Sequence, residues 1–188
     1  MARKIGKTLI DRESIRRRVR EIGLALSADL EADLGAEGND ALDHPDRIVM
    51  LPILTGAIVF VADLIREMPL KMSMRMVTVS SYPGQSTKSR GASLRGALPQ
   101  DLGGRHVVVV DDILDSGHTL ALVRELILEQ NPASLRLCVL LEKQVPRSRA
   151  VTLNYTGFQI PDEFVVGYGL DYDGFYRNLP EIVTLELE

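Results

Sequence analysis

The fold of this chain is decided by the stretch VVVVDDILDSGHT, which spans Val107–Thr119. Its four valines favour a buried β-strand, because β-branched side chains pack well on a pleated surface. The strand leads into two adjacent carboxylates, Asp111 and Asp112, and then into a short turn that opens a helix. Ligands of open α/β sheets bind beyond the carboxyl ends of the strands, so we expect the two acids to face a binding crevice.

The turn after the acids, Asp115–Thr119, has the chemistry of a phosphate site. The first N–H groups of a helix lack intrahelical partners and the helix dipole is positive there, which suits a phosphate monoester. Gly117 lets the backbone approach a ligand closely, and Ser116 and Thr119 can add hydroxyl donors. A ribose 5-phosphate needs donors for its phosphate and acceptors for its hydroxyls, and this stretch offers both. The alternative is a helix cap made by Asp115 or Ser116, with solvated acids beside it.

The segments around this stretch alternate between strand and helix patterns. Apolar residues at spacings of three and four predict an amphipathic helix over residues 11–34, with Asp11 as its N-cap and Gly35 as its stop. Two more helices are predicted at Ala57–Met68 and from Ser116 to about Gln130. Apolar or alternating runs predict further strands at Ile48–Leu54, Lys71–Ser81, Leu135–Leu141, Phe164–Gly167 and Ile182–Leu185.

This alternation predicts an α/β fold with a mainly parallel sheet flanked by helices, in one domain that spans residues 1–188. Residues 82–104 are rich in glycine and proline, and we expect a long loop or a strongly bent hairpin there. Loops of this length are uncommon in compact domains and usually have a function.

Composition excludes several classes of protein. The formal net charge of −4 argues against a protein that binds nucleic acid through its overall charge. A single cysteine, Cys138, lies in an apolar run, so we interpret it as a buried core thiol. The chain has neither a run of about 20 apolar residues nor the apolar stretch of a signal peptide at its start. We therefore expect no membrane association and a cytoplasmic location.

The stretch Val107–Thr119 resembles the signature of the type I phosphoribosyltransferases, which bind 5-phosphoribosyl 1-diphosphate, and it lacks the pattern of a Walker loop. The resemblance implies that Asp111 and Asp112 meet the ribose hydroxyls directly or through Mg²⁺. It also implies a small hood over the sheet, formed by terminal segments and a mobile loop. Five residues of the turn would hold the 5-phosphate: Asp115, Ser116, Gly117, His118 and Thr119.

From about residue 48 to the C-terminus the chain is similar to the hypoxanthine-guanine branch of that family. The branch binds the leaving diphosphate at positions that correspond here to Leu54, Thr55, Gly56 and Arg177, often with the first peptide of the loop in the cis form. It binds the purine at Lys143, Phe164, Val165 and Asp171, and Mg²⁺ at Asp111, Asp112 and Asp171. Its mobile lid corresponds to Ser81, Tyr82 and the loop that follows.

Lys143 is the residue that points to the base. A lysine donor suits a 6-oxopurine and is mismatched to the 6-amino group of adenine, which is itself a donor. Phe164 would stack on the base, and the alternative for its ring is ordinary core packing. Two positions depart from the branch: His118 stands where relatives commonly have lysine or arginine, and Thr55 stands where some have lysine.

The activity implied is transfer of the phosphoribosyl group to N9 of hypoxanthine or guanine, with Asp115 as the candidate general base for N7. A xanthine-preferring enzyme is the alternative within the family. The alternative from another class is a regulator that reuses the fold to bind RNA through the arginines of residues 12–20. The branch forms homodimers or homotetramers, and the helix Ala57–Met68 would be either an interface or part of the core.

Overall fold

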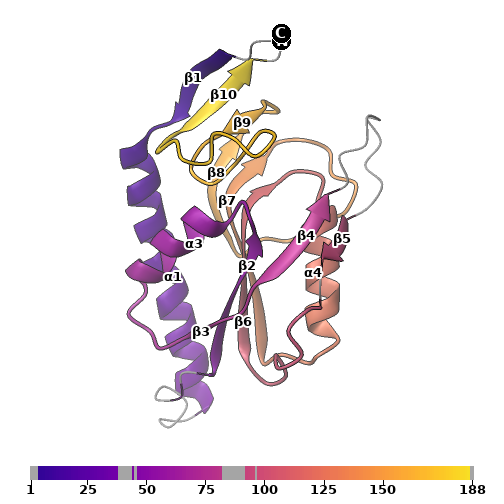
Figure 1. Cartoon of the computed structure of the whole chain (residues 1–188). Coiled ribbons are helices and arrows are strands. Elements are labelled where there is room, and N and C mark those ends of the chain that lie inside the picture. Colours follow the sequence, from indigo (N-terminus) through magenta and orange to yellow (C-terminus); the bar gives the residue numbers. More distant parts are fainter. Residues whose placement is uncertain (1–3, 38–43, 45, 82–91, 96, 187–188) are drawn as a thin grey trace.

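The computed structural model describes residues 4–37, 44, 46–81, 92–95 and 97–186. In this part of the chain the main sheet has the strand order β5-β4-β2-β6-β7-β8, with a short β3 added beside β2 (Figure 1). All neighbours are parallel except β4 and β5. The strands are β2 (Ile48–Leu54), β3 (Ser73–Met74), β4 (Val77–Ser81), β5 (Ala92–Arg95), β6 (His106–Leu114), β7 (Ser134–Lys143) and β8 (Tyr155–Ile160).

Helices cover both faces of this sheet. The long helix α1 (Arg12–Glu37) and the short α3 (Ile58–Leu64), which ends in the 3₁₀ turn η1 (Ile65–Glu67), lie on one face. Helix α4 (His118–Leu128) lies on the other (Figure 1). The valines of β6 alternate between the two: Val108 and Val110 pack into the cluster of α1 and α3, whereas Val107 and Val109 pack into that of α4. Both faces of the central strand are therefore buried, as its unbroken apolar sequence predicts.

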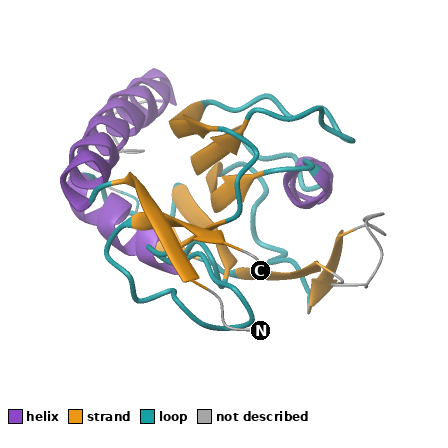
Figure 2. Cartoon of the chain, turned by 90° about the horizontal axis from the view of Figure 1, so that it is seen from above, coloured by secondary structure: helices purple, strands orange, loops and turns teal. Residues whose placement is uncertain are grey.

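A second, small antiparallel sheet joins the two ends of the described chain. Its order is β1 (Lys4–Ile10), β10 (Ile182–Glu186) and β9 (Val165–Val166). Figure 1 shows it beyond one end of the large sheet, and Figure 2 shows the same arrangement from above. The expected hood of terminal segments is thus confirmed. The loop expected to complete it falls mostly on residues 82–91, which lie outside the described residues.

The expected α/β class is confirmed, but several element boundaries differ from the prediction. Helix α1 continues past the expected stop at Gly35 to Glu37, whose carboxylate contacts Arg47 and His106 and so holds the last turn. Its predicted cap is confirmed, because the Asp11 carboxylate accepts a hydrogen bond of 2.8 Å from the N–H of Ser14.

Other segments are shorter or more divided than their patterns suggest. The helix predicted at Ala57–Met68 ends at Leu64, and the strand predicted at Lys71–Ser81 is split into β3 and β4. Residues Ala92–Arg95, in the middle of the glycine-rich segment, pair antiparallel with β4, as the hairpin alternative expects. Strands β1 and β8 were not predicted from the sequence.

The remaining expectations concern burial. Cys138 is fully buried, and burial raises the pKa of its thiol to about 12, so it is the core thiol predicted. No helix in the described part of the chain is both long enough and apolar enough to cross a membrane.

Candidate active site

A pocket of about 780 Å³ opens at the carboxyl ends of β2 and β6. Segments far apart in the sequence meet there: the loop Leu54–Gly56, the stretch Asp111–Gly117 with Thr119, and the pair Asp171 and Arg177. The expected position of the acids at a crevice is thus confirmed. It follows from the parallel sheet, which brings the ends of its strands to one edge.

The two acids at the end of β6 lie next to each other, Asp111 buried and Asp112 half-buried. Asp111 is 5% exposed, and its carboxylate accepts a hydrogen bond of 3.0 Å from the N–H of Asp112. Burial, together with the charge of Asp112, raises the pKa of Asp111 well above its ordinary value. Burial also raises the pKa of Asp112, although the charge of Arg177 opposes this. Such a pair favours a ligand that brings positive charge or hydroxyl donors.

The loop after β2 packs directly against this pair. The peptide bond Leu54–Thr55 is cis, as the resemblance implies. A Cβ atom at Gly56 would come within 1.7 Å of a carboxylate oxygen of Asp112, so a larger residue there would displace the Asp112 side chain. On its other side, the carbonyl of Gly56 lies against Gly169, where a Cβ atom would come within 2.3 Å of it. This loop is therefore held between the acids and the segment that leads to Arg177.

The turn Asp115–Thr119, here called the phosphate turn, leaves the first N–H groups of α4 without a side-chain cap. The N-cap of this helix is Gly117, with a φ of +84°, and no side chain of the cap bonds the first turn. The alternative in which Asp115 or Ser116 caps the helix is therefore wrong. Thr119 lines the pocket, whereas His118 begins the helix and is not among its lining residues. The free N–H groups of the first turn remain available to an anion.

Lys143 connects this pocket to the expected purine site. It ends β7, its side chain is 12% exposed, and its Nζ atom lies 3.6 Å from Asp115 and 3.0 Å from Asp162. Sequence reasoning assigned no role to Asp162. The only signal was its position two residues before Phe164. The two carboxylates hold the ammonium group beside the phosphate turn.

Phe164 and Val165 are not among the residues that line this pocket. Phe164 is 41% exposed and meets Tyr172 edge to face, with 5.3 Å between the ring centroids. Its ring is therefore not part of the core, which removes the alternative of ordinary core packing. Val165 is 5% exposed and lies in β9, paired with Thr184. Its backbone is thus fixed by the hood.

Arg177 and Asp171 pair with each other. Arg177 donates a hydrogen bond of 2.6 Å to the carbonyl of Gly169 and lies 2.7 Å from a carboxylate oxygen of Asp171. The other oxygen of Asp171 accepts a hydrogen bond of 2.7 Å from the N–H of Gly174. Both side chains are therefore oriented, and the Arg177 guanidinium lies at the pocket beside the acid pair.

A magnesium ion would need ligands beyond the protein. Among the described residues, no three His, Cys, Asp or Glu side chains are close enough to form a metal site by themselves. Asp111, Asp112 and Asp171 thus do not form one preformed cluster. They do supply hard carboxylate oxygens, and Mg²⁺ is usually bound by one or two carboxylates together with substrate phosphates. The residues present fit such a shared site.

Of the two residues expected in the lid, Ser81 lies in the described part of the chain. Its backbone ends β4 and pairs with Ala92. Tyr82 lies outside the described residues.

The sheet order and the phosphate turn after the central strand define a class of enzymes that bind ribose phosphates, and sequence comparison identifies that class. Residues 20–173 match the phosphoribosyl transferase domain. The chain therefore belongs to the phosphoribosyltransferase family, in its type I class.

Within that class the chain is similar over almost its full length to hypoxanthine-guanine phosphoribosyltransferases. The enzyme of that name from Mycobacterium tuberculosis is 40% identical over 183 residues, which cover 97% of this chain and 87% of the relative. A hypoxanthine-guanine phosphoribosyltransferase from Bacillus anthracis has a crystal structure that matches this one with a TM-score of 0.81. The two sequences are 36% identical, and the match covers 98% of this chain and 100% of the Bacillus anthracis chain. A Trypanosoma cruzi hypoxanthine phosphoribosyltransferase in complex with the product IMP is 32% identical, with a TM-score of 0.82, and covers 97% and 95%.

Proposed function

We propose that this protein is a purine salvage enzyme that transfers the 5-phosphoribosyl group from phosphoribosyl diphosphate to N9 of hypoxanthine or guanine, giving IMP or GMP and diphosphate. The observation that carries the proposal is the position of Lys143, whose ammonium group lies 3.6 Å from Asp115, the first residue of the phosphate turn. A donor for a purine oxygen and a site for a ribose phosphate are thus adjacent. The names of the relatives agree with this reaction.

The two halves of the site divide the substrates between them. The turn Asp115–Thr119 binds the 5-phosphate through backbone N–H groups and hydroxyls, and Asp111 and Asp112 accept the ribose hydroxyls. The backbone of Leu54–Gly56, with the Arg177 guanidinium, binds the diphosphate and stabilises the charge that develops as it leaves. Bound Mg²⁺ would supply further charge neutralisation for the diphosphate oxygens, held by Asp111, Asp112 or Asp171.

The purine is recognised by its oxygen. Lys143 donates to O6, Phe164 stacks on the ring and the backbone of Val165 contacts its edge, while Asp115 accepts the proton of N7 as N9 attacks C1′. Adenine has a donor where the 6-oxopurines have an acceptor, so its 6-amino group would face the ammonium of Lys143 without a hydrogen bond.

The setting we propose is a magnesium-dependent homodimer or homotetramer in the cytoplasm. Helix α3 divides its residues between both roles considered for it. Phe60 and Leu64 are fully buried against the sheet, whereas Ile58 is 47% exposed. The exposed Ile58 supports an interface between subunits, and the buried Phe60 and Leu64 belong to the core.

The RNA-binding alternative is disfavoured by the pairing of the arginines on α1. Arg16 lies 3.9 Å from Glu13, Arg18 lies 2.8 Å from Glu21, and Arg20 lies 4.0 Å from Glu67. Acids thus accompany these arginines, as on an ordinary solvated helix face.

The test is a magnesium-dependent assay with phosphoribosyl diphosphate and hypoxanthine, guanine, xanthine or adenine, read as nucleotide formed. We expect turnover of the first two bases and none of adenine. Turnover of xanthine alone would favour the xanthine-preferring alternative. Binding of phosphoribosyl diphosphate without turnover of any base would refute the proposal and favour a regulator.

The variant Lys143→Ala tests the purine half separately. Loss of a hydrogen bond from a charged donor costs about 1.5–3 kcal/mol, so the KM for hypoxanthine should rise by roughly ten- to a hundredfold. The KM for phosphoribosyl diphosphate should stay close to the wild-type value, because the phosphate turn is unchanged. An equal rise in both constants, measured by steady-state kinetics, would contradict the assignment of Lys143.

A further inference from the structure

The segment that connects β7 to β8, residues 144–154, lies against the phosphate turn. The N–H of Arg149 donates a hydrogen bond of 3.3 Å to the carbonyl of Ser116. The carbonyl of Arg149 is so close to Gly117 that a Cβ atom there would come within 2.3 Å of it. The turn thus lines the pocket, and its residues Ser116 and Gly117 also contact the backbone of this segment.

Two ion pairs hold the segment in place. Arg147 pairs with Glu142 of β7, and these side chains are 25% and 17% exposed. The hydroxyl of Thr156 also donates to Glu142, at 3.3 Å. Arg149 pairs with Glu125 of α4, but both of these side chains are about half exposed, and exposed pairs contribute little. Of the two ion pairs, the Arg147 pair is therefore the better shielded from solvent.

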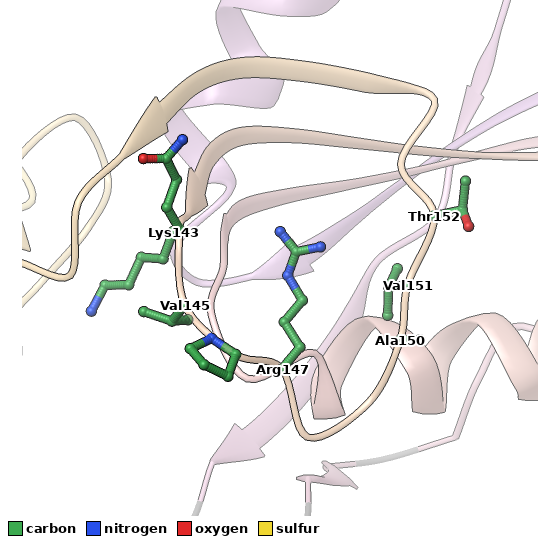
Figure 3. A pocket seen from close by; sticks show the side chains of 8 residues that line it. Lys143, Val145, Arg147, Ala150, Val151 and Thr152 are labelled. Atoms are coloured by element: carbon green, nitrogen blue, oxygen red, sulfur yellow. The ribbon is translucent and has the colours of Figure 1, made fainter.

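The position of Arg147 is not explained by stability alone. Figure 3 shows its side chain running from the connecting segment back toward the strands, while the side chain of Lys143 points away from it. The two residues line the same hollow of about 600 Å³. The Nε atom of Arg147 is buried and has no hydrogen-bond partner among the described residues. A buried donor without a partner is unfavourable, and it calls for another reason for the residue.

We infer that Arg147 is a positioning residue for the ribose 5-phosphate: by fixing the connecting segment on Glu142, it keeps Arg149 against Ser116 and Gly117 and so fixes the turn that binds the phosphate. The inference rests on the proposed function. Backbone donors bind a phosphate well only when they are already in place, and a misplacement of 1 Å at a site can reduce activity by about a hundredfold. Arg147 itself does not line the pocket.

The test compares Arg147→Met, Arg147→Lys and a control, Arg75→Met. Methionine keeps the apolar stem and removes the guanidinium, whereas lysine keeps a cation for Glu142. Arg75 matches Arg147 because it also pairs with one carboxylate, Asp101, and is 34% exposed, but it is not among the residues that line the pocket. Two quantities are measured for each variant: the KM for each substrate, and the Kd for IMP by calorimetry.

We expect Arg147→Met to raise the KM for phosphoribosyl diphosphate and the Kd for IMP by roughly ten- to a hundredfold, with the KM for hypoxanthine within about twofold of wild type. Arg147→Lys should recover most of the loss, and Arg75→Met should change neither constant. A purely structural role would lower the melting temperature and the active fraction but leave both constants unchanged, which would overturn the inference.

If Arg147→Met fails to fold because Glu142 is left buried without its partner, the double variant Glu142→Gln with Arg147→Met removes both charges. A folded double variant with wild-type affinity for phosphoribosyl diphosphate and IMP would overturn the inference, and a weakened affinity would support it. A wild-type protein that binds IMP but converts no base would refute the proposed function only. The binding constants of the variants would then still decide the role of Arg147.

Discussion

The polar groups at the two ends of strand β6 differ in the partners that the chain gives them. At its amino end, His106 is 3% exposed, with one ring nitrogen 2.8 Å from the Ser134 hydroxyl and the other 3.1 Å from Glu37. At its carboxyl end, the buried Asp111 lies next to the half-buried Asp112. At the amino end the polar groups thus form hydrogen bonds with one another, whereas at the carboxyl end two carboxyl groups are adjacent.

The acids at the amino end are stabilised by the chain itself. The Arg47 guanidinium holds the pKa of the Glu37 carboxyl below its ordinary value. Burial would raise the pKa of Asp33, but the hydrogen bond and charge of Arg136, 2.8 Å away, outweigh this and lower it. These contacts tie α1 to the start of β6 and β7, and they need no ligand.

The acids at the carboxyl end have raised pKa values chiefly because burial disfavours their charged forms, and the charge of Asp112 adds to the effect at Asp111. The same end of the sheet leads to a segment in which three non-glycine residues have a positive φ: Tyr168, Asp173 and Tyr176. Unfavourable conformations and perturbed pKa values of this kind gather at functional sites. The contrast therefore separates residues that serve stability from residues of the proposed active site.

The largest effect should come from Asp115→Asn. We expect kcat to fall by about 10²–10⁴, the usual range for removal of a positioned acid–base group. The melting temperature should be almost unchanged, because the Asp115 side chain is 56% exposed. A loss of less than tenfold in kcat would exclude Asp115 as the general base.

At the other end of β6, His106→Ala should do the reverse. It removes the partner of Ser134 and Glu37 at a buried position, so the free energy of unfolding should fall by about 1–3 kcal/mol. The kinetic constants of the folded fraction should stay at wild-type values. His44→Ala is the control, because His44 is exposed, and urea unfolding of both variants measures the difference. Equal stability of the two variants would contradict the role of the His106 network.

Asp111→Asn should make the protein more stable and less active. Asparagine keeps an acceptor for the N–H of Asp112 and removes a buried carboxyl group next to that residue. We expect a gain on the order of 1 kcal/mol, which raises the melting temperature by roughly 2–4 °C, with loss of turnover. A lower melting temperature without ligand would show that the acid pair is not a source of strain.

The smallest effect is a pH dependence at the amino end. A carboxyl group whose pKa is lowered in the folded state stabilises the protein above its ordinary pKa, and this contribution disappears as the pH falls through the lowered value. The difference in unfolding free energy between wild type and Glu37→Gln should therefore be present at about pH 7 and shrink below about pH 4. A difference that grows on acidification would have the wrong sign for the Arg47 pair.

The parts of the fold that could be predicted are those with a local pattern. The valines of β6, the acids after them and the glycine of the turn are consecutive, so strand, site and helix start follow from adjacent residues. Strand β8 has no such pattern, because it mixes polar residues with a glycine, Gly157, and is defined by its pairing with β7. Strands β9 and β10 could be predicted from their apolar runs, but their pairing with each other and with β1 in the hood joins distant segments.

The site shows the same limit. Asp111, Asp112 and Gly117 could be assigned from their neighbours, whereas Asp162 is defined by its contact with Lys143, 19 residues away. His106 gave no signal in the sequence, since its partners lie 28 and 69 residues away. Residues defined by their partners in space become visible only when the chain is folded.

The pairing of β1 with β10 has a consequence for the order in which the protein is made. Lys4 lies opposite Glu186, and β10 in turn pairs with β9, which contains Val165. The elements around the phosphate turn, from β2 to α4, are synthesised well before β10, and contacts between distant segments form slowly because their loops must close first. A growing chain should therefore form its large sheet and the turn Asp115–Thr119 before the hood fixes the backbone of Val165.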